Sequence, residues 1–143
     1  MGPCPPRDEM LRAYLIHLAS RLFHFLKPMN STCLFCKIVA GDAKASIVYQ
    51  DDLVTAFRDI HPVAPTHILI VPNRHIESVN QADAADASAL GNLFLAAQKI
   101  AELENIQQGG YRLIVNTGPH GGQTIFHLHM HLLGGQRMKH PMG

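Results

Sequence analysis

The chain has 143 residues, about the size of one domain, and 47% of them are apolar, which is enough to form a buried core. The 12 Lys and Arg residues against 11 Asp and Glu give a net charge of +1, which argues against the basic surface of a nucleic-acid-binding protein but is compatible with a small anionic ligand. The three cysteines, an odd number, do not match the paired framework of a secreted protein, so we expect a reducing, cytoplasmic setting.

The first 30 residues differ from the rest of the chain. Residues 10–26 form an apolar run that two arginines and two histidines interrupt. A membrane span needs about 20 mostly apolar residues and a signal peptide has a cleaner apolar centre, so neither fits this segment. We interpret residues 1–30 as a disordered or weakly helical extension, with Met29 as an alternative start of the native protein, and expect the folded domain over residues 31–143 without membrane contact.

Two helices and five strands are predicted in this domain. The expected ranges are 33–40 for a short helix, 46–49, 53–58 and 67–71 for three strands, 82–104 for a long helix, and 111–116 and 124–133 for two more strands. A glycine-rich loop over residues 117–123 separates the last two strands. Strands joined by tight turns pair antiparallel, and an amphipathic helix covers one face of a sheet, so we predict an α+β fold.

The densest chemical signal is the segment from His127 to His131, in which histidine alternates with leucine and methionine. Side chains alternate between the two faces of a strand, so we expect the three imidazoles on one face, about 7 Å apart in succession. Two plainer explanations are a solvent-exposed polar strand face and a zinc site. The glycine-rich loop before this strand can turn N–H groups toward an anion, which favours a phosphate site.

Residues 32–143 resemble the histidine triad (HIT) family, and in particular its Hint branch of purine nucleoside phosphoramidases. The resemblance rests on the stretch HLHMHLL and on the segments AFRDIHPVAPTHILIVP, GYRLIVNTG and GGQTIFHLHMHLLGG. It implies a five-stranded antiparallel sheet with one long and one short helix, and a homodimer formed through a helix and a strand. It also implies a hydrolase that cleaves purine nucleoside 5′-phosphoramidates at the P–N bond, releases a nucleoside monophosphate and an amine, and needs no cofactor for catalysis.

The resemblance assigns catalytic roles to four histidines. His129 would attack the α-phosphorus and form a covalent nucleotidyl-histidine, which water then hydrolyses, so that one difficult step becomes two. A neutral imidazole attacks only if its other nitrogen is held as a donor, and a nearby backbone carbonyl is a suitable acceptor. His131 would contact the phosphate oxygens and the leaving group. His127 and His67 would orient the nucleophile.

The same resemblance assigns a second set of residues to the substrate. Asp59 would bind the ribose hydroxyls, although an aspartate at such a place more often caps its loop. Asn116 and Thr124 would lie near the phosphate and the leaving group. Backbone donors would come from Gly122 and Gln123. The apolar cleft for the purine would be formed by Leu34, Phe35, Ile38 and Phe57, for which ordinary core packing is the alternative.

Cys33 and Cys36 have the Cys-x-x-Cys spacing of zinc ligands, a weak signal alone because two small residues of a helix look the same. According to the resemblance, some family members hold a structural zinc with this pair and two histidines, which correspond here to His75 and His127. Many members of the Hint branch lack the cysteines and work without metal. The sequence therefore leaves two alternatives open, a structural zinc site and a metal-free pair of thiols.

Three other functions compete with the phosphoramidase. A dinucleoside polyphosphate hydrolase of a neighbouring HIT branch would carry a similar triad, so only the flanking segments argue against it. A nucleotide-binding protein with weak turnover and a module that only binds metal are the other two. The chain also departs from the Hint branch in two places. It has no tryptophan near its C-terminus, which leaves the preferred leaving group open, and it has His61 where serine is usual, for which the sequence offers no explanation.

Overall fold

The computed structural model describes residue 30 and residues 32–140, so the interpretation of residues 1–29 lies outside the described residues. The elements are, in order, α2 (Leu34–Ala40), β1 (Ile47–Gln50), β2 (Val54–Arg58), β3 (Thr66–Pro72), two 3-10 turns (Val79–Gln81 and Ala84–Asp86), α3 (Ala87–Leu103), β4 (Tyr111–Val115) and β5 (Met130–Gly134). Within the described part of the chain, none of the helices has the length and apolar character needed to span a membrane.

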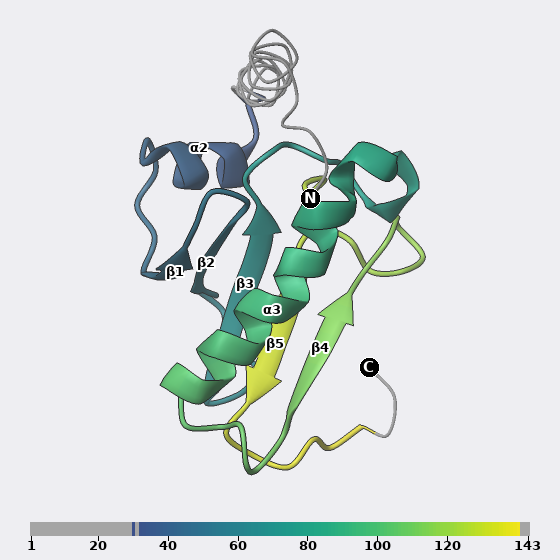
Figure 1. Ribbon diagram of the computed structural model, residues 1–143. Helices are drawn as coiled ribbons and strands as arrows, with labels where there is room; N and C mark the ends of the chain where they lie inside the picture. The colour runs from purple at the N-terminus through teal and green to yellow at the C-terminus, as the bar shows by residue number, and fades with distance from the viewer. Residues whose placement is uncertain (1–29, 31, 141–143) are drawn as a thin grey trace, which may run out of the picture.

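The five strands form one antiparallel sheet in the order β1-β2-β3-β5-β4 (Figure 1). This confirms the predicted α+β fold with one long and one short helix. β3 lies between β2 and β5, and all seven of its residues are buried. A continuous apolar run suits such a strand, because both of its faces are covered.

The two faces of the sheet carry different helices. On one face α3 lies across the strands and covers the larger core, which includes Ile70 and Met130 (Figure 1). On the other face α2 packs Phe35 into a smaller core that includes Leu69. Leu69 pairs with His131, and paired residues of neighbouring strands share a face. His131 therefore lies on the face opposite α3.

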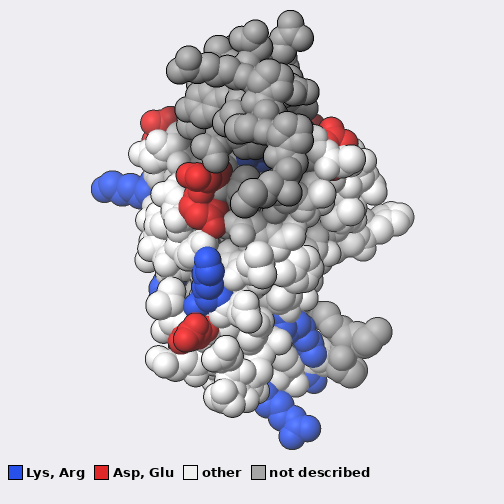
Figure 2. Space-filling view, viewed as in Figure 1, with Lys and Arg blue, Asp and Glu red and all other residues white. Residues whose placement is uncertain are grey.

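The molecular surface on the α3 side is sparsely charged. Figure 2 shows Lys and Arg side chains that lie singly on this side, and most of the visible described surface belongs to uncharged residues. The outer side of α3 itself exposes Phe94, Leu95 and Leu103. This side of the described residues therefore presents scattered charges and exposed apolar side chains rather than a continuous basic patch.

α3 begins later than predicted, at Ala87 rather than at residue 82. The chain first forms a 3-10 turn closed by a capping box, in which Ala85 N donates to Asp83 Oδ1 at 2.8 Å and Asp83 N donates to Asp86 Oδ2 at 3.0 Å. The buried Asp86 also forms an ion pair with Arg74. Aspartate side chains that bond to nearby backbone N–H groups compete with helix formation, so these acidic residues form the turn before the helix rather than its first turn.

β5 also begins later than predicted, at Met130 rather than at residue 124. Its pairing with both neighbours begins there, with Ile70 of β3 and Val115 of β4 opposite Met130, and Val115 is the last residue of β4. Pro72, which the same register places opposite Leu128, has no N–H to donate to a ladder. Residues 124–129 therefore precede the sheet instead of belonging to it. One backbone hydrogen bond, from Leu128 N to Ile76 O at 2.6 Å, connects them to the segment that follows β3.

Replacing Asp86 with alanine should lower the free energy of unfolding by about 3 kcal/mol, because it removes the capping box and leaves Arg74 without its buried partner. Urea unfolding followed by circular dichroism measures this change. The matched control is Asp52→Ala at an exposed site, which should cost less than about 0.5 kcal/mol. An equally small loss for Asp86→Ala would contradict the role of this carboxylate.

Candidate active site

A hydrogen-bonded pair of histidines joins the two central strands. His67 on β3 and His131 on β5 approach so that His67 Nε2 lies 3.0 Å from His131 Nδ1. The backbone N–H of Val63 donates to His67 Nδ1 at 3.1 Å, so the proton of neutral His67 is on Nε2 and is donated to His131. The proton of neutral His131 is then on its own Nε2, which gives this ring one N–H donor for a ligand.

Asp59 follows β2 and lies beside this pair. Its Oδ1 accepts a hydrogen bond from the backbone N–H of His61 at 2.8 Å, and its Oδ2 lies 3.3 Å from His67 Nε2. The carboxylate therefore caps its loop and also lies close to the N–H that connects the two histidines. The ribose contact assigned to it from the sequence stays a prediction.

Both histidines of the pair are neutral near pH 7. Burial lowers the pKa of His67, and the nearby Asp59 carboxylate opposes this effect. Burial, together with the neighbouring His129 and His67, lowers the pKa of His131 to about 4. A neutral His131 keeps the acceptor at Nδ1 and the donor at Nε2, whereas a second proton on the ring would face the N–H of His67.

His129 has the lone pair that a nucleophile needs. Its Nδ1 donates to the backbone carbonyl of His127 at 2.7 Å, so the neutral ring carries no proton on Nε2. The ring packs edge-on against Phe35 and beside His131, with centroid separations of 5.3 and 5.0 Å. The structure thus brings a ring with a fixed lone pair next to a ring with an N–H donor. His129 is 5% exposed, so little of it is open to a ligand.

His127 belongs to a different cluster and is fully buried. Its Nε2 donates to the carbonyl of Pro72 at 2.9 Å, and its Nδ1 lies 3.4 Å from Cys33 Sγ and 3.6 Å from Cys36 Sγ. Burial lowers the pKa of His127 to about 4, although the Pro72 carbonyl favours the protonated form. The imidazole of His127 therefore faces the cysteines as a neutral acceptor, and its backbone carbonyl is the group that bonds to His129.

The strand predicted over residues 124–133 is wrong in its start, because His127 and His129 precede β5. The predicted alternation is nevertheless present: Leu128, Met130 and Leu132 lie in the core under α3, whereas the rings of His127 and His129 pack on Phe35 on the other face. The three imidazoles belong to two neighbouring clusters, because His127 contacts the cysteines and His129 lies beside His131.

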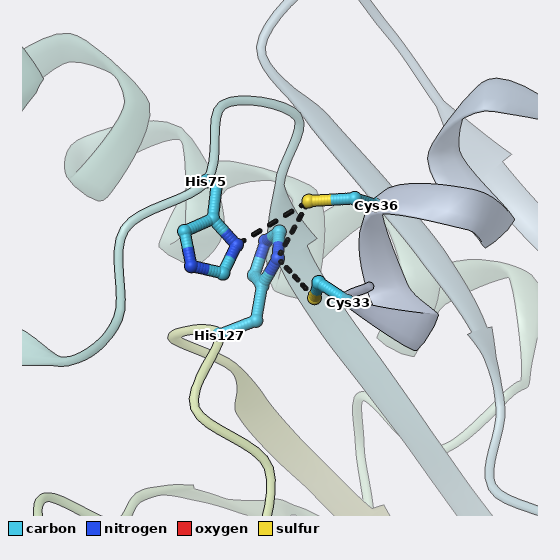
Figure 3. A group of neighbouring side chains, drawn as sticks. All are labelled: Cys33, Cys36, His75 and His127. Carbon is cyan, nitrogen blue, oxygen red and sulfur yellow. Dashed lines mark hydrogen bonds between the residues drawn. The ribbon is translucent and has the colours of Figure 1, made fainter. Parts of the chain in front are cut away.

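The side chains of Cys33, Cys36, His75 and His127 face one another in a compact group (Figure 3). One ligand atom from each residue lies within 4.8 Å of the other three, and Cys36 Sγ lies 3.3 Å from His75 Nδ1. The group joins the start of α2, the segment after β3 and the segment before β5 (Figure 3). Two thiols and two imidazoles are a ligand set of structural zinc, so these residues fit such an ion.

Without metal, the buried thiol of Cys36 is protonated near neutral pH. Burial raises the pKa of Cys36 to about 11, and the adjacent Cys33 thiol adds to the rise. The contacts with His75 and His127 are then hydrogen bonds to thiols, which are weak donors. Zinc takes thiolates as ligands, so its binding would release protons and replace these weak contacts.

The side chain of Gln123 closes the glycine-rich loop from the inside. This buried amide accepts from Gly118 N at 2.9 Å and donates to the carbonyls of Glu77 at 2.7 Å and Ile125 at 3.1 Å. It therefore connects both ends of the loop to the segment after β3. Sequence reasoning missed this role, because nothing in the pattern shows that a glutamine among glycines is buried.

The two backbone donors assigned to the phosphate already have partners within the loop. Gly122 N donates to Pro119 O and Gln123 N donates to Gly118 O, both at 3.1 Å. Contact with a phosphate would require these bonds to break. The exposed Thr124 follows directly and carries a hydroxyl that is open to a ligand.

Asn116 lies where the sequence predicted a polar residue near the phosphate. It follows β4 directly, and Ile114, two residues earlier, pairs with His131. Side chains two residues apart on an extended chain share a face, so Asn116 continues the face that carries His131. Its contact with a ligand stays a prediction.

Three of the four residues assigned to a purine cleft belong to the core. Phe35, Ile38 and Phe57 are buried between α2 and the sheet, with the rings of Phe35 and Phe57 edge-on at 5.3 Å. Leu34 is 49% exposed. Core packing is therefore observed for three members of this set, and Leu34 is the member with its side chain open to a ligand.

Comparison with known proteins gives the family. Residues 40–138 match the HIT domain family. The chain belongs to the HIT family. This HIT protein is 56% identical over 108 residues to a protein of Escherichia coli K12 named purine nucleoside phosphoramidase, and the match covers 76% of this chain and 91% of that one. It is 46% identical over 115 residues to an uncharacterized HIT-like protein of Synechococcus elongatus, with 80% of this chain and 100% of that one covered.

Solved structures give the same result. A HIT family hydrolase from Legionella pneumophila superposes with a TM-score of 0.75 at 46% identity, over 78% of this chain and 100% of that one. A HIT family hydrolase from Clostridium thermocellum superposes with a TM-score of 0.76 at 45% identity, over 78% of this chain and 97% of that one. The protein is a hydrolase of the HIT family.

The low pKa of His131 predicts how the stability of this HIT protein depends on pH. An unfolded histidine has a pKa of about 6.5, so between that pH and about pH 4 the unfolded chain binds a proton that the folded chain does not. Stability should therefore fall as the pH is lowered through this window. His131→Asn should flatten the dependence, as measured by urea unfolding across the window. The exposed His140→Asn is the control, and equal slopes for the two variants would contradict the assignment.

Proposed function

We propose that this HIT hydrolase cleaves the P–N bond of purine nucleoside 5′-phosphoramidates and releases the nucleoside monophosphate and an amine. The observation that carries the proposal is the 2.7 Å hydrogen bond from His129 Nδ1 to the His127 carbonyl, because it leaves Nε2 of His129 unprotonated. The substrate class follows from the name of the Escherichia coli relative, purine nucleoside phosphoramidase, at 56% identity.

In the first step, Nε2 of His129 attacks the α-phosphorus, and the bond to the amine nitrogen breaks with its electron pair on that nitrogen. The departing nitrogen takes one proton from solvent and leaves as the amine. The ring of His129 now carries the nucleotidyl group and a positive charge, which the His127 carbonyl stabilises through the Nδ1–H bond. His131 donates a hydrogen bond from Nε2 rather than the proton itself, because its low pKa keeps the ring neutral.

In the second step, a water molecule attacks the same phosphorus, and the bond to His129 breaks with its electron pair on Nε2. The water loses one proton to solvent, which balances the proton taken up in the first step. The nucleoside monophosphate leaves, and both histidines return to their starting tautomers. An N–H donor such as that of His131 accelerates both steps most if it lies where negative charge develops on the phosphate oxygens.

The substrate contacts in this proposal come from side chains at the edges of the histidine pair. Asp59 would accept from the ribose hydroxyls while its other oxygen caps the loop, since a carboxylate has several acceptor sites. Asn116 and Thr124 would donate to the phosphate. Leu34, the exposed member of the apolar set, would contact the purine.

Trapping the covalent adduct tests the proposed nucleophile. Protein mixed with adenosine 5′-phosphoramidate and quenched in alkaline denaturant should show a nucleotidyl group on His129 by mass spectrometry. His129→Gly should abolish the adduct and lower kcat by at least about a thousandfold, because the neighbouring rings of His67 and His131 carry their own protons on Nε2. Calorimetry with adenosine monophosphate should show binding that is largely retained.

Two outcomes would contradict the proposal. Full turnover by His129→Gly would mean that the nucleophile is assigned wrongly. Faster cleavage of diadenosine polyphosphates than of the phosphoramidate would place the enzyme in the neighbouring branch. Asp52→Ala, at an exposed position, is the control for the effect of mutation and purification, and its kcat should match that of the wild type.

We further propose that Cys33, Cys36, His75 and His127 bind one structural zinc ion. The bond from His127 Nε2 to the Pro72 carbonyl keeps Nδ1 unprotonated and directed at the thiols, as a ligand requires. Four protein ligands leave a tetrahedral zinc without an open position, so the ion would supply stability and no direct contact with the substrate.

Metal analysis tests the zinc proposal. Protein prepared with zinc present should hold about one zinc per chain and release it when the thiols are modified. Cys36→Ser should lose most of the zinc, because the set would keep only three of its four ligands. Cys4→Ser is the matched thiol control and should retain it. Less than about one tenth of an equivalent in the wild type would end the proposal.

The homodimer expected from the family resemblance stays a prediction. The apolar side chains that α3 exposes, Phe94, Leu95 and Leu103, are of the kind that a second copy covers. Sedimentation velocity measures the association state directly.

A further inference from the structure

The segment that carries the nucleophile has few bonds to hold it. His129 precedes β5, so neither it nor His127 is held by the sheet ladder. Its hydrogen bonds to the rest of the chain include one from the His127 ring to Pro72 O, at the end of β3, at 2.9 Å, and one from Leu128 N to Ile76 O, after β3, at 2.6 Å. The position of the His127 backbone therefore depends strongly on what holds its side chain.

His127 takes part in two clusters through two different groups. Its Nδ1 lies 3.4 Å from Cys33 Sγ and 3.6 Å from Cys36 Sγ, in the group that Figure 3 shows. Its backbone carbonyl accepts from His129 Nδ1 at 2.7 Å. One residue thus connects the metal-ligand group directly to the nucleophile.

Phe35 gives a second connection between the same two clusters. It lies between the two cysteines in the sequence, at the start of α2, and its ring packs edge-on against His127 and His129 with centroids 5.9 and 5.3 Å away. The N-cap of α2, Cys33, makes no side-chain cap hydrogen bond. The partners of the cysteines therefore help to hold this end of the helix, and with it the ring of Phe35.

We propose that His75, Cys33 and Cys36 are positioning residues for catalysis: a zinc ion bound to them and to His127 fixes the carbonyl that orients His129. The inference rests on the proposed nucleophile and zinc ion, and adds that a site without contact to the substrate sets the turnover rate. The thiol–imidazole contacts of 3.3 to 3.6 Å within this group are weak by themselves. Four bonds to zinc would restrain these side chains far more tightly.

The test uses one ligand position and two kinds of measurement. His75→Ala removes a ligand, whereas His75→Cys replaces it with another zinc ligand and is the conservative rescue. Zinc content, kcat and KM on adenosine 5′-phosphoramidate are measured for both variants, for the zinc-loaded wild type and for the wild type after chelation. The ¹⁵N chemical shifts of the His129 ring report which nitrogen carries the proton, and this readout needs no substrate.

Loss of zinc should lower kcat by about ten- to a hundredfold and change KM by less than about twofold, because orientation of the nucleophile is affected rather than binding. The ring shifts of His129 should move from a single tautomer toward a mixture of both. His75→Cys should restore zinc, kcat and the ring shifts together. Asp52→Ala should leave all of them unchanged.

The possible results separate this inference from the proposals on which it rests. The inference would be overturned if the wild type binds no zinc. It would also be overturned if loss of zinc lowers Tm but leaves kcat and the His129 ring shifts, both measured well below Tm, unchanged. If His75→Ala does not fold, the wild type after chelation is compared with the zinc-loaded wild type instead. If the zinc-loaded protein forms no nucleotidyl adduct but the His129 shifts still follow zinc, the coupling stands and the proposed reaction fails.

Discussion

The hydrogen bond from His129 Nδ1 to the His127 carbonyl is the constraint on which the site depends. A neutral imidazole has one lone pair, and this bond decides that it is on Nε2. The carbonyl is available because the segment lies outside the sheet: β3 ends at Pro72, so no strand competes for it with a ladder bond. The point at which the sheet stops therefore leaves room for the interaction that keeps the lone pair of His129 on Nε2.

A second backbone group sets the opposite tautomer in the neighbouring ring. Val63 N–H donates to His67, His67 donates to His131, and the remaining proton of His131 is left on Nε2. The two adjacent rings, His129 and His131, thus present a lone pair and an N–H respectively from the same ring position. This pattern requires neutral rings, and burial provides them by lowering the pKa of His67 and His131.

The sequence predicted the elements whose residues carry a strong periodic signal. The continuous apolar run of β3 and the apolar stripe of α3 were predicted. The three strands before α3, the two strands after it and their antiparallel pairing were predicted as well. The start of β5 was wrong, because the alternating pattern from His127 onward looks like a strand, whereas pairing with β3 and β4 begins only at Met130. Whether a segment is paired depends on its neighbour, which its own residues do not encode.

The candidate site was predicted in composition better than in arrangement. The residue types of the zinc group and of the histidine pair were found from spacing and family resemblance, and the structure brings both sets together. A backbone carbonyl was expected to hold the ring of His129, but the residues that supply the backbone partners, Val63, Pro72 and His127, could not be predicted, because a main-chain group leaves no trace in the residue type. The two roles of residue 127 therefore differ in what they require of its side chain: every amino acid has the backbone acceptor for His129, whereas the proposed zinc ion needs a metal-binding side chain. A lineage could therefore lose the proposed ion at this position and still keep the acceptor.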